Sequence, residues 1–223
     1  MRLLIALFAL FAPLTVSAAP DWTTTVTRAA NGAYVMGNPK AKVRLVEYLS
    51  YSCPHCAHFT GEAAAPLKAG FIAKGTVAVE MRNAVRDRYD FTAAVLARCG
   101  GPSRFFGNTE ALFGAQDALL TKAAAFEASE ALPEGAPVAV ALKGMAKGSG
   151  LNDFMVARGF TIAQVNACLV DKPSQNAVLA LTKEAWNVRK IPGTPTFLIN
   201  GQPAKTAEWS QIEAKLRVAV ARR

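Results

Sequence analysis

The feature of this sequence that most restricts its fold is a pair of cysteines placed where a strand gives way to a helix. Val43–Ser50 is β-rich and alternating, which is typical of a strand. The tetrapeptide Cys53–Cys56 (Cys-Pro-His-Cys) follows almost at once, and the alanine-rich segment Ala57–Lys68 predicts a helix. Thr76–Asn83 predicts a second strand. A strand, a helix and a strand in this order form a βαβ unit with two parallel strands.

A long helical stretch follows this unit. About a hundred residues after the second strand carry mostly helical patterns. Asp90 is the expected N-cap of a helix over Phe91–Cys99. Thr161, with Gln164 three residues later, resembles a capping box that begins a helix over Ile162–Val170.

The two ends of the chain complete the expected sheet domain. Asn200 and Gly201 form a hairpin signal after a short β-rich run, and Ala207–Arg222 has the apolar spacing of an amphipathic helix. Before the first strand we expect only a short edge strand near Ala33–Val35. The sequence therefore predicts an α/β sheet domain that is interrupted by a helical insertion.

These elements divide the chain into four consecutive parts. Residues 1–18 form an expected signal peptide, and residues 19–88 form the first part of the sheet domain. Residues 89–174 form the helical insertion, and residues 175–223 form the second part of the sheet domain.

The first residues predict export. Met1 and Arg2 precede the apolar run Leu3–Ala12, and small residues up to Ala18 form a cleavage site, as in a secretory signal. The apolar run is too short to span a bilayer, which needs about 20 apolar residues. An uncleaved membrane anchor is the alternative. If the chain is exported, its four cysteines can form disulfides, because thiols outside the cytosol can be oxidised and stay oxidised.

Composition excludes one class of protein, and the charge pattern makes a second one less favoured. A hydrophobic fraction of 52% excludes a disordered chain. The formal net charge is +9, but the basic residues are scattered rather than gathered into a stripe with interleaved aromatic residues. We therefore predict a basic solvated surface, and contact with nucleic acid or an anionic membrane is the less favoured alternative.

The position of the two cysteines predicts thiol chemistry. Cys53 would lie at the start of the helix, where free backbone N–H groups and the helix dipole stabilise a thiolate. Pro54 suits the first turn, where its missing N–H is not needed. A cationic His55 would favour the thiolate further. Cys56, one turn on, would be more buried and protonated, so we expect Cys53 to form a mixed disulfide that Cys56 resolves.

Three other interpretations of the two cysteines are less favoured. A structural disulfide would close only a very short loop. A zinc site could draw on Cys53, Cys56, His55 and His58, but structural zinc needs four ligands, usually with a second distant pair, which the sequence lacks. Covalent haem requires histidine directly after the second cysteine, where Ala57 stands. A dithiol–disulfide redox centre without metal is the favoured interpretation.

Two segments of the chain resemble a known family. Val46–Cys56 (VEYLSYSCPHC) is similar to the active-site segment of DsbA-like thiol–disulfide oxidoreductases, and Gly193–Phe197 (GTPTF) is similar to their cis-proline loop. The resemblance extends from about Val35 to the C-terminus. It implies an α/β, thioredoxin-like fold with a helical insertion domain, and so a thioredoxin-like sheet domain.

This resemblance implies a role for each matching residue near the cysteines. Cys53 is the reactive cysteine, Cys56 is its partner, and His55 tunes the redox equilibrium by stabilising reduced Cys53. Glu47 matches the family's buried acid beneath the active site, and such a group could pass protons to or from Cys56. The alternative for Glu47 is a strand residue that faces solvent or forms a salt bridge.

The cis-proline loop carries the implied substrate contacts. Pro195 would be cis and pack against the disulfide, and the Thr194 backbone would hydrogen-bond an extended substrate. Most X-Pro bonds are trans, so only the resemblance implies the cis form. The best-known strong oxidant of the family has valine in place of Thr194, whereas threonine also occurs in disulfide isomerases. Such isomerases usually carry an N-terminal dimerisation domain, for which residues 21–38 are too few, so we expect a monomer.

The other two cysteines, Cys99 and Cys168, lie on predicted helices of the insertion. In an exported chain we expect a structural disulfide between them. Two free buried thiols or a second redox centre are the alternatives. Similar pairs occur in some members of the family.

The resemblance implies an exported, periplasmic enzyme. It would donate the Cys53–Cys56 disulfide to reduced exported proteins through a mixed disulfide, and a membrane partner would reoxidise it. We expect no cofactor besides this disulfide, no metal and no nucleic-acid partner. An isomerase or reductase that is kept reduced, or a non-catalytic peptide-binding chaperone on the same scaffold, are the alternatives.

Overall fold

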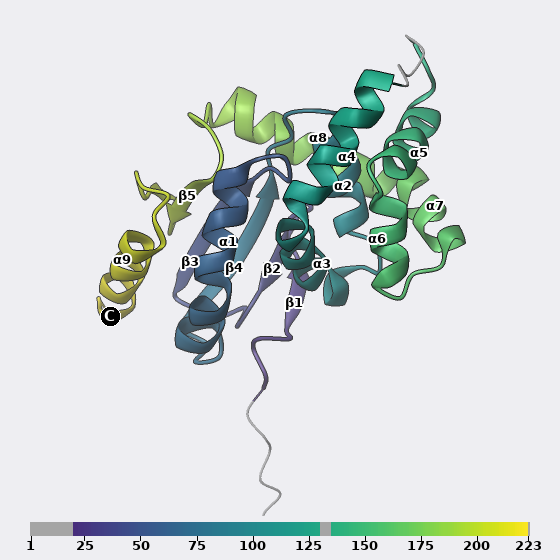
Figure 1. Ribbon diagram of the computed structural model, residues 1–223. Coiled ribbons are helices and arrows are strands. Elements are labelled where there is room, and N and C mark those ends of the chain that lie inside the picture. The colour runs from purple at the N-terminus through teal and green to yellow at the C-terminus, as the bar shows by residue number, and fades with distance from the viewer. Residues whose placement is uncertain (1–19, 130–134, 223) are drawn as a thin grey trace, which may run out of the picture.

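The computed structural model describes residues 20–129 and 135–222 (Figure 1). The signal peptide predicted over residues 1–18 lies outside the described residues. A mixed six-stranded sheet has the strand order β1-β2-β4-β3-β5-β6. Its strands are β1 (Val26–Arg28), β2 (Tyr34–Met36), β3 (Val43–Leu49), β4 (Val77–Asn83), β5 (Thr196–Ile199) and β6 (Gln202–Pro203).

Helices surround this sheet. They are α1 (Pro54–Leu67), α2 (Arg88–Ala97), α3 (Pro102–Gly114), α4 (Gln116–Ser129), α5 (Val138–Gly148), α6 (Leu151–Ala157), α7 (Ile162–Val170), α8 (Lys172–Lys183) and α9 (Trp209–Ala221), with π-helical turns η1 (Lys68–Ile72) and η2 (Glu184–Val188). Helices α2–α7 lie together to one side of the sheet, between β4 and β5 in the chain (Figure 1). Within residues 20–129 and 135–222, none of the helices combines the length and the apolar character that a bilayer span requires.

Strands β3 and β4 form the predicted βαβ unit with α1. They are parallel, with Val43 opposite Val77 and Leu49 opposite Asn83. Side chains on both faces of these strands are buried, as expected for a parallel pair in the middle of an α/β sheet. The predicted βαβ unit is confirmed.

The segment before β3 contributes two strands. β1 pairs with β2, and β2 pairs antiparallel with β4, so that β1 forms the edge of the sheet. The prediction of an edge strand near Ala33–Val35 is therefore wrong in its place, because this strand lies inside the sheet and all its residues are buried. Pairing across the sheet decides which strand is at the edge, and a three-residue segment carries no local signal of that pairing.

The two faces of the sheet pack against different helices. Along β3, Leu45 and Leu49 belong to the core that includes side chains of α1 and α9. Val46 and Tyr48 point to the other face, where they pack with Ala185 of η2. This alternation is the two-residue period of a strand, and it assigns Glu47 to the α1 face.

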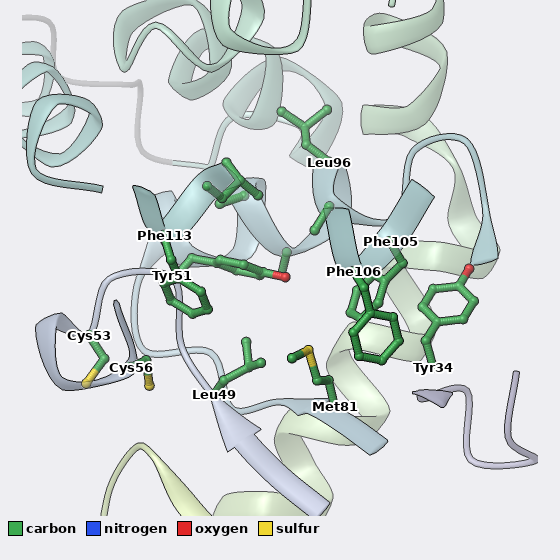
Figure 2. Packing of buried hydrophobic residues seen from close by; sticks show 14 of the residues in the cluster. Tyr34, Leu49, Tyr51, Cys53, Cys56, Met81, Leu96, Phe105, Phe106 and Phe113 are labelled. Carbon is green, nitrogen blue, oxygen red and sulfur yellow. The ribbon is translucent and has the colours of Figure 1, made fainter. Parts of the chain in front are cut away.

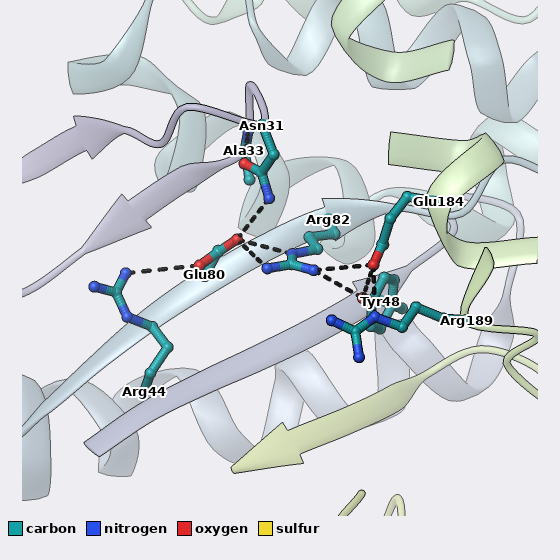
Figure 3. Close-up of polar contacts among 8 residues, drawn as sticks. All are labelled: Asn31, Ala33, Arg44, Tyr48, Glu80, Arg82, Glu184 and Arg189. Carbon is teal, nitrogen blue, oxygen red and sulfur yellow. Dashed lines mark hydrogen bonds and ion pairs between the residues drawn. The ribbon is translucent and has the colours of Figure 1, made fainter. Parts of the chain in front are cut away.

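A network of charged side chains fastens η2 to the second face (Figure 3). The Tyr48 hydroxyl donates to Glu184 Oε1 over 2.9 Å, and Arg82 Nη1 lies 3.3 Å from the same oxygen. Arg82 Nη2 is also 2.7 Å from Glu80 Oε1, and Arg189 Nε donates to Glu184 over 2.9 Å. The network holds one end of the loop that leads into β5.

The pairing of β5 holds the other end of this loop. β5 runs antiparallel to β3, with Thr196 opposite Tyr48. Asn200 and Gly201 have positive φ angles of 49° and 81°, and they form the predicted hairpin into β6. The pairing places Pro195 beside the end of β3, where the chain turns into α1.

The N-caps of two helices were predicted from the sequence, one correctly and one wrongly. The capping box of Thr161 and Gln164 begins α7 as predicted. The N-cap of α2 is Asp87, whose Oδ1 accepts from the backbone N–H of Asp90 over 2.7 Å. The predicted cap at Asp90 is therefore wrong, because Asp90 lies inside the first turn, where its buried side chain binds another segment.

A disulfide joins two helices of the insertion. Cys99 and Cys168 are bonded, with 5.6 Å between their Cα atoms. Cys99 is the second residue after the end of α2, and Cys168 lies in α7. The bond therefore ties the end of α2 to the last turns of α7.

Candidate active site

Cys53 and Cys56 lie at the start of α1, at the margin of the hydrophobic core (Figure 2). Cys53 is the N-cap residue, and Pro54 occupies the first turn, as predicted. Both cysteines are free thiols and both are buried. Only three residues separate the end of β3 from Cys53, so the helix begins at the same edge of the sheet as the Pro195 loop.

The two thiols have opposite acidities. The Cys56 thiol, which donates to the sulfur of Cys53, and the backbone N–H groups of His55 and Cys56 lower the pKa of Cys53 to about 4. Burial raises the pKa of Cys56, and the sulfur of Cys53 and the nearby Glu47 raise it further. At neutral pH, reduced Cys53 is therefore a thiolate and Cys56 is a thiol.

Glu47 is buried beneath these cysteines. Its side chain does not face solvent, and its Oε1 has no hydrogen-bond partner among the described residues. Burial raises the pKa of Glu47 to about 8. A carboxyl group in this environment is protonated at neutral pH, and its charge influences Cys56 when it ionises.

The Thr194–Pro195 peptide bond is cis. The Thr194 carbonyl oxygen lies 3.0 Å from the Cys53 sulfur, and it accepts a hydrogen bond from this sulfur when Cys53 is protonated. The Thr196 hydroxyl donates to the Gly193 carbonyl over 2.7 Å and closes the turn. Thr194 and Pro195 are half-buried, so a partner molecule can reach the loop from the side of Cys53.

The histidines near the cysteines lie at the surface. His55 is exposed in the first turn of α1, and the Nε2 of His58 lies 3.4 Å from Glu62 Oε1, one turn further on. Over residues 20–129 and 135–222, no group of three or more His, Cys, Asp or Glu side chains is placed to hold a metal ion.

Asp90 holds the turn that leads into Cys53. Its Oδ2 accepts from the Ser50 hydroxyl over 2.6 Å and from the backbone N–H of Arg86 over 2.9 Å. Its Oδ1 accepts from the backbone N–H of Tyr51 over 2.7 Å. Burial raises the pKa of Asp90 to about 7. This carboxylate from the insertion therefore positions the backbone just before Cys53.

Gln116, at the start of α4, holds the same turn from another side. Its Nε2 donates to the Tyr51 carbonyl over 2.9 Å and to the Cys53 carbonyl over 3.0 Å. The Tyr51 hydroxyl and the Thr109 hydroxyl of α3 are 2.8 Å apart, and the Tyr51 ring stacks on Phe113. Three helices of the insertion thus contact the turn at Tyr51.

The sequence did not identify Asp90, Gln116 or Thr109 as part of this site. Each is separated from the turn by 39 to 65 residues. Other polar residues occur on the same helices, so residue type alone does not distinguish these three.

Comparison with known proteins places these features in a family. The family model described as Thioredoxin matches residues 29–217. A Rickettsia bellii protein named as a protein-disulfide oxidoreductase is 27% identical over 186 residues, which cover 83% of this chain and 64% of the relative. A Rickettsia typhi protein with the same type of name is 28% identical over 180 residues, covering 80% and 59%. The chain spans about three fifths of the length of these curated relatives.

Solved structures agree with this family. A protein-disulfide isomerase from Novosphingobium aromaticivorans is 33% identical, with a TM-score of 0.76, over 86% of this chain and all of that one. The α-DsbA1 protein of Wolbachia pipientis is 18% identical, with a TM-score of 0.68, over 86% of this chain and 93% of that one. The expected α/β, thioredoxin-like fold with a helical insertion is confirmed.

Proposed function

Because the chain belongs to the thioredoxin family, among its DsbA-like members, we propose that it is an exported thiol–disulfide oxidoreductase. It donates the Cys53–Cys56 disulfide to reduced exported proteins. The Rickettsia relatives named as protein-disulfide oxidoreductases support this class of reaction. The observation that carries the proposal is geometric: Cys53 is the N-cap of α1, beside the cis-proline loop, and Cys56 is buried in the first turn of the helix.

The acidity of Cys53 favours transfer of the disulfide to a substrate. The pKa of Cys53 is about 4, so the reduced form is stabilised as a thiolate at neutral pH. A stabilised reduced form makes the corresponding disulfide a stronger oxidant. A thiol of low pKa is also a good leaving group from a mixed disulfide.

The reaction takes place in two exchange steps. A substrate thiolate attacks the Cys53 sulfur, the Cys53–Cys56 bond breaks, and a mixed disulfide with Cys53 forms. A second substrate thiolate then attacks the substrate sulfur of that bond and releases Cys53 as a thiolate. The substrate gains a disulfide and loses two electrons, which pass to the cysteine pair.

Glu47 supplies the proton for the first step. When Cys53 is attacked, Cys56 leaves as a buried thiolate, which burial disfavours. The carboxyl group of Glu47, with a pKa of about 8, is protonated at neutral pH and can give a proton to Cys56, directly or through water. Protonated Cys56 is then a weak competitor for the mixed disulfide.

The Pro195 loop binds the substrate backbone. The Thr194 backbone next to Cys53 pairs with an extended peptide, so that main-chain hydrogen bonds supply affinity with little dependence on sequence. Exposed His55 and Pro54 border the approach to Cys53, and His55 helps to stabilise its thiolate.

Several features of the proposal concern the whole protein in the cell. We place it in the periplasm as a monomer, with a membrane partner that accepts two electrons and restores the disulfide. The residue pattern at the N-terminus supports export. The division at residues 88/89 and 174/175 into sheet domain and insertion is part of the same proposal.

The redox equilibrium of the mature protein with glutathione buffers tests the oxidase role. Alkylation of free thiols followed by mass measurement reports the reduced fraction. We expect a potential nearer to about −120 mV than to the about −270 mV of thioredoxin-type reductants. A potential at the thioredoxin end would overturn the oxidase role and favour a reductase.

Cysteine variants test the catalytic steps. Cys56→Ser is expected to accumulate mixed disulfides with a substrate protein that already carries a disulfide. The Cys53 thiolate attacks this disulfide and releases one substrate thiolate, and no Cys56 thiol is present to break the new bond. Cys53→Ser forms no mixed disulfide. If Cys53→Ser oxidises substrates at the wild-type rate, the assignment of Cys53 as the reactive cysteine is wrong. If the wild-type protein oxidises nothing but binds unfolded chains as Cys53→Ser does, the chaperone interpretation replaces ours.

Isomerase activity is the second candidate, and one observation favours it. The N. aromaticivorans structure with 33% identity is named a protein-disulfide isomerase. Refolding of a substrate with scrambled disulfides, in the presence of the reduced protein, distinguishes the two roles. Recovery of native pairing at a rate close to that of substrate oxidation would favour the isomerase.

A further inference from the structure

A pocket of about 300 Å³ lies away from the two redox cysteines, between β1, the end of α2 and the start of α8. Its lining includes two arginines, one aspartate and the Cys99–Cys168 disulfide. None of the steps proposed above uses it. Its most unusual feature is a buried positive charge.

The guanidinium of Arg98 lines this pocket and is almost completely buried. Arg98 is 4% exposed, and its Nη2 donates to the Gly32 carbonyl over 2.6 Å. Its Cζ lies 4.4 Å from the centre of the Tyr34 ring. Nε and Nη1 have no hydrogen-bond partner among the described residues. Arginine keeps its charge in proteins, so these donors have lost water without a protein acceptor in return.

The surroundings of Arg98 are also positive. Arg28 lines the same pocket. Burial lowers the pKa of Arg98, and the charge of Arg28 lowers it further. Within the described chain, neither arginine has a carboxylate within 4.0 Å. A buried charge of this kind is strongly destabilising unless a counter-charge is present.

Asp171 offsets only part of this charge. It is the one acidic residue in the described lining of the pocket. Its Oδ2 accepts from the Ser174 backbone N–H over 2.9 Å, so the carboxylate caps α8. With two arginines and one aspartate, the lining keeps a formal charge of +1, and the positive end of the α8 dipole adds to it.

The walls of the pocket are fixed before anything binds. The Cys99–Cys168 disulfide joins the end of α2, which carries Arg98, to α7. The rings of Tyr34 and Phe105 pack at a tilted angle with 4.6 Å between their centres (Figure 2), and the Tyr34 ring in turn lies 4.4 Å from the Arg98 Cζ atom. A site whose donors are held in place loses little entropy when a ligand binds.

We propose that this pocket binds a small oxyanion, either phosphate or the carboxylate group of a small molecule, through Arg98 and Arg28. Charge-assisted hydrogen bonds between an arginine and an oxyanion are strong. Nε and Nη1 of Arg98 lie on different edges of the guanidinium, so the anion accepts from one of these free donors. Arg28 contributes from the exposed rim.

Titration of the full oxidised chain with three sodium salts tests this site. Phosphate, acetate and chloride are compared at equal ionic strength, and two signals are followed: the thermal unfolding midpoint and the NMR signal of the Arg98 Nε–H group. We expect a saturable rise of the midpoint and a shift of this signal with the same Kd. Stronger binding of phosphate assigns a phosphate ligand, and stronger binding of acetate assigns a carboxylate.

Equal effects of all three salts would overturn the proposal. Arg28→Gln is expected to weaken binding about tenfold, since a hydrogen bond to a charged group of this type is lost. Arg222→Gln, the same change at an exposed position near the C-terminus, is the control and leaves the Kd unchanged. Equal Kd values in these two variants would also overturn the site.

Arg98→Lys examines the buried residue itself. It keeps the charge but replaces the planar guanidinium and its fixed N–H donors by a single ammonium group, and we expect it to bind the anion at least tenfold more weakly. Wild-type affinity in this variant would contradict the role of Arg98. If Arg98→Lys does not fold, the comparison of Arg28→Gln with Arg222→Gln decides.

Discussion

Replacing Gln116 by alanine tests whether the helical insertion acts on the redox site. Gln116 is the only described side chain that donates to the Tyr51 carbonyl, and it also binds the Cys53 carbonyl. The Cys53 carbonyl keeps the backbone N–H of Cys56 at 3.1 Å and that of Ala57 at 3.3 Å in the variant. The Tyr51 carbonyl is left without its partner.

The lost hydrogen bonds should change both the stability of the protein and the pKa of Cys53, and the structure gives the size of each change. A buried carbonyl without its donor costs about 1–3 kcal/mol, and with the lost packing we expect a loss of about 2–4 kcal/mol of stability. The first turn of α1 is also less well held, so its N–H groups bind the thiolate less well. A helix N-terminus contributes about 0.3–1 kcal/mol to an anion, so the pKa of Cys53 should rise by about half a unit.

Gln175→Ala provides the matched control. Gln175 is also buried, and its Nε2 donates to the Leu169 carbonyl over 2.6 Å, at the start of α8. Denaturant unfolding measures the stability of both variants, and the ultraviolet absorbance of the thiolate against pH measures the pKa of reduced Cys53. We expect similar stability losses but a shifted pKa only in Gln116→Ala. Equal pKa values in the two variants would refute the coupling of the insertion to the site.

Three further predictions follow from buried charges and from the disulfide. The pKa values of Glu47 and Asp90 are about 8 and about 7 in the folded state. The folded protein therefore keeps two protons that the unfolded chain releases above about pH 4. The stability that these two protonated groups contribute is complete below about pH 4 and is lost as the pH rises through 7 to 8. Glu47→Gln should reduce the fall in unfolding free energy between pH 5 and 8 by on the order of 3 kcal/mol. Urea unfolding at several pH values measures this fall, and the same fall in the variant as in the wild type would contradict the burial argument. Asp90→Asn should lower the unfolding free energy by about 2 kcal/mol at neutral pH, because the amide NH2 group would face N–H and O–H donors from which the carboxylate accepts hydrogen bonds. Wild-type stability of this variant in urea unfolding would show that these hydrogen bonds are replaceable. Replacing both Cys99 and Cys168 by alanine opens a link across 69 positions and should cost roughly 4 kcal/mol by the loop-entropy model; a loss below about 1 kcal/mol would point to an unfolded state that is already compact.

The parts of the fold that could be predicted are those that residues close together in the sequence determine. The alternation in Val43–Ser50, the turn residues Asn200 and Gly201 and the capping box at Thr161 each act within a few residues. Their structural outcome depends on backbone chemistry that neighbours share. For the same reason the start of α1 at Cys53 could be placed from the sequence.

The parts that could not be predicted depend on contacts between distant segments. Asp90 is a good helix cap by residue type, yet Asp87 caps α2 and Asp90 binds Ser50 and Tyr51 instead. Local propensity favours either aspartate, and the tertiary contact decides. The contacts of Gln116 with the active-site turn likewise follow from how the insertion packs on the sheet domain, which no short motif encodes.

The loop that carries Thr194 is anchored on both sides. The network around Glu184 fixes η2 to the sheet, and the pairing of Thr196 with Tyr48 fixes the start of β5. A peptide that docks on this loop therefore loses its own conformational freedom but does not have to order the loop as well. Short contacts between backbones can then suffice for chains of very different sequence, and loosening the anchor by Glu184→Gln should weaken all of them to a similar degree.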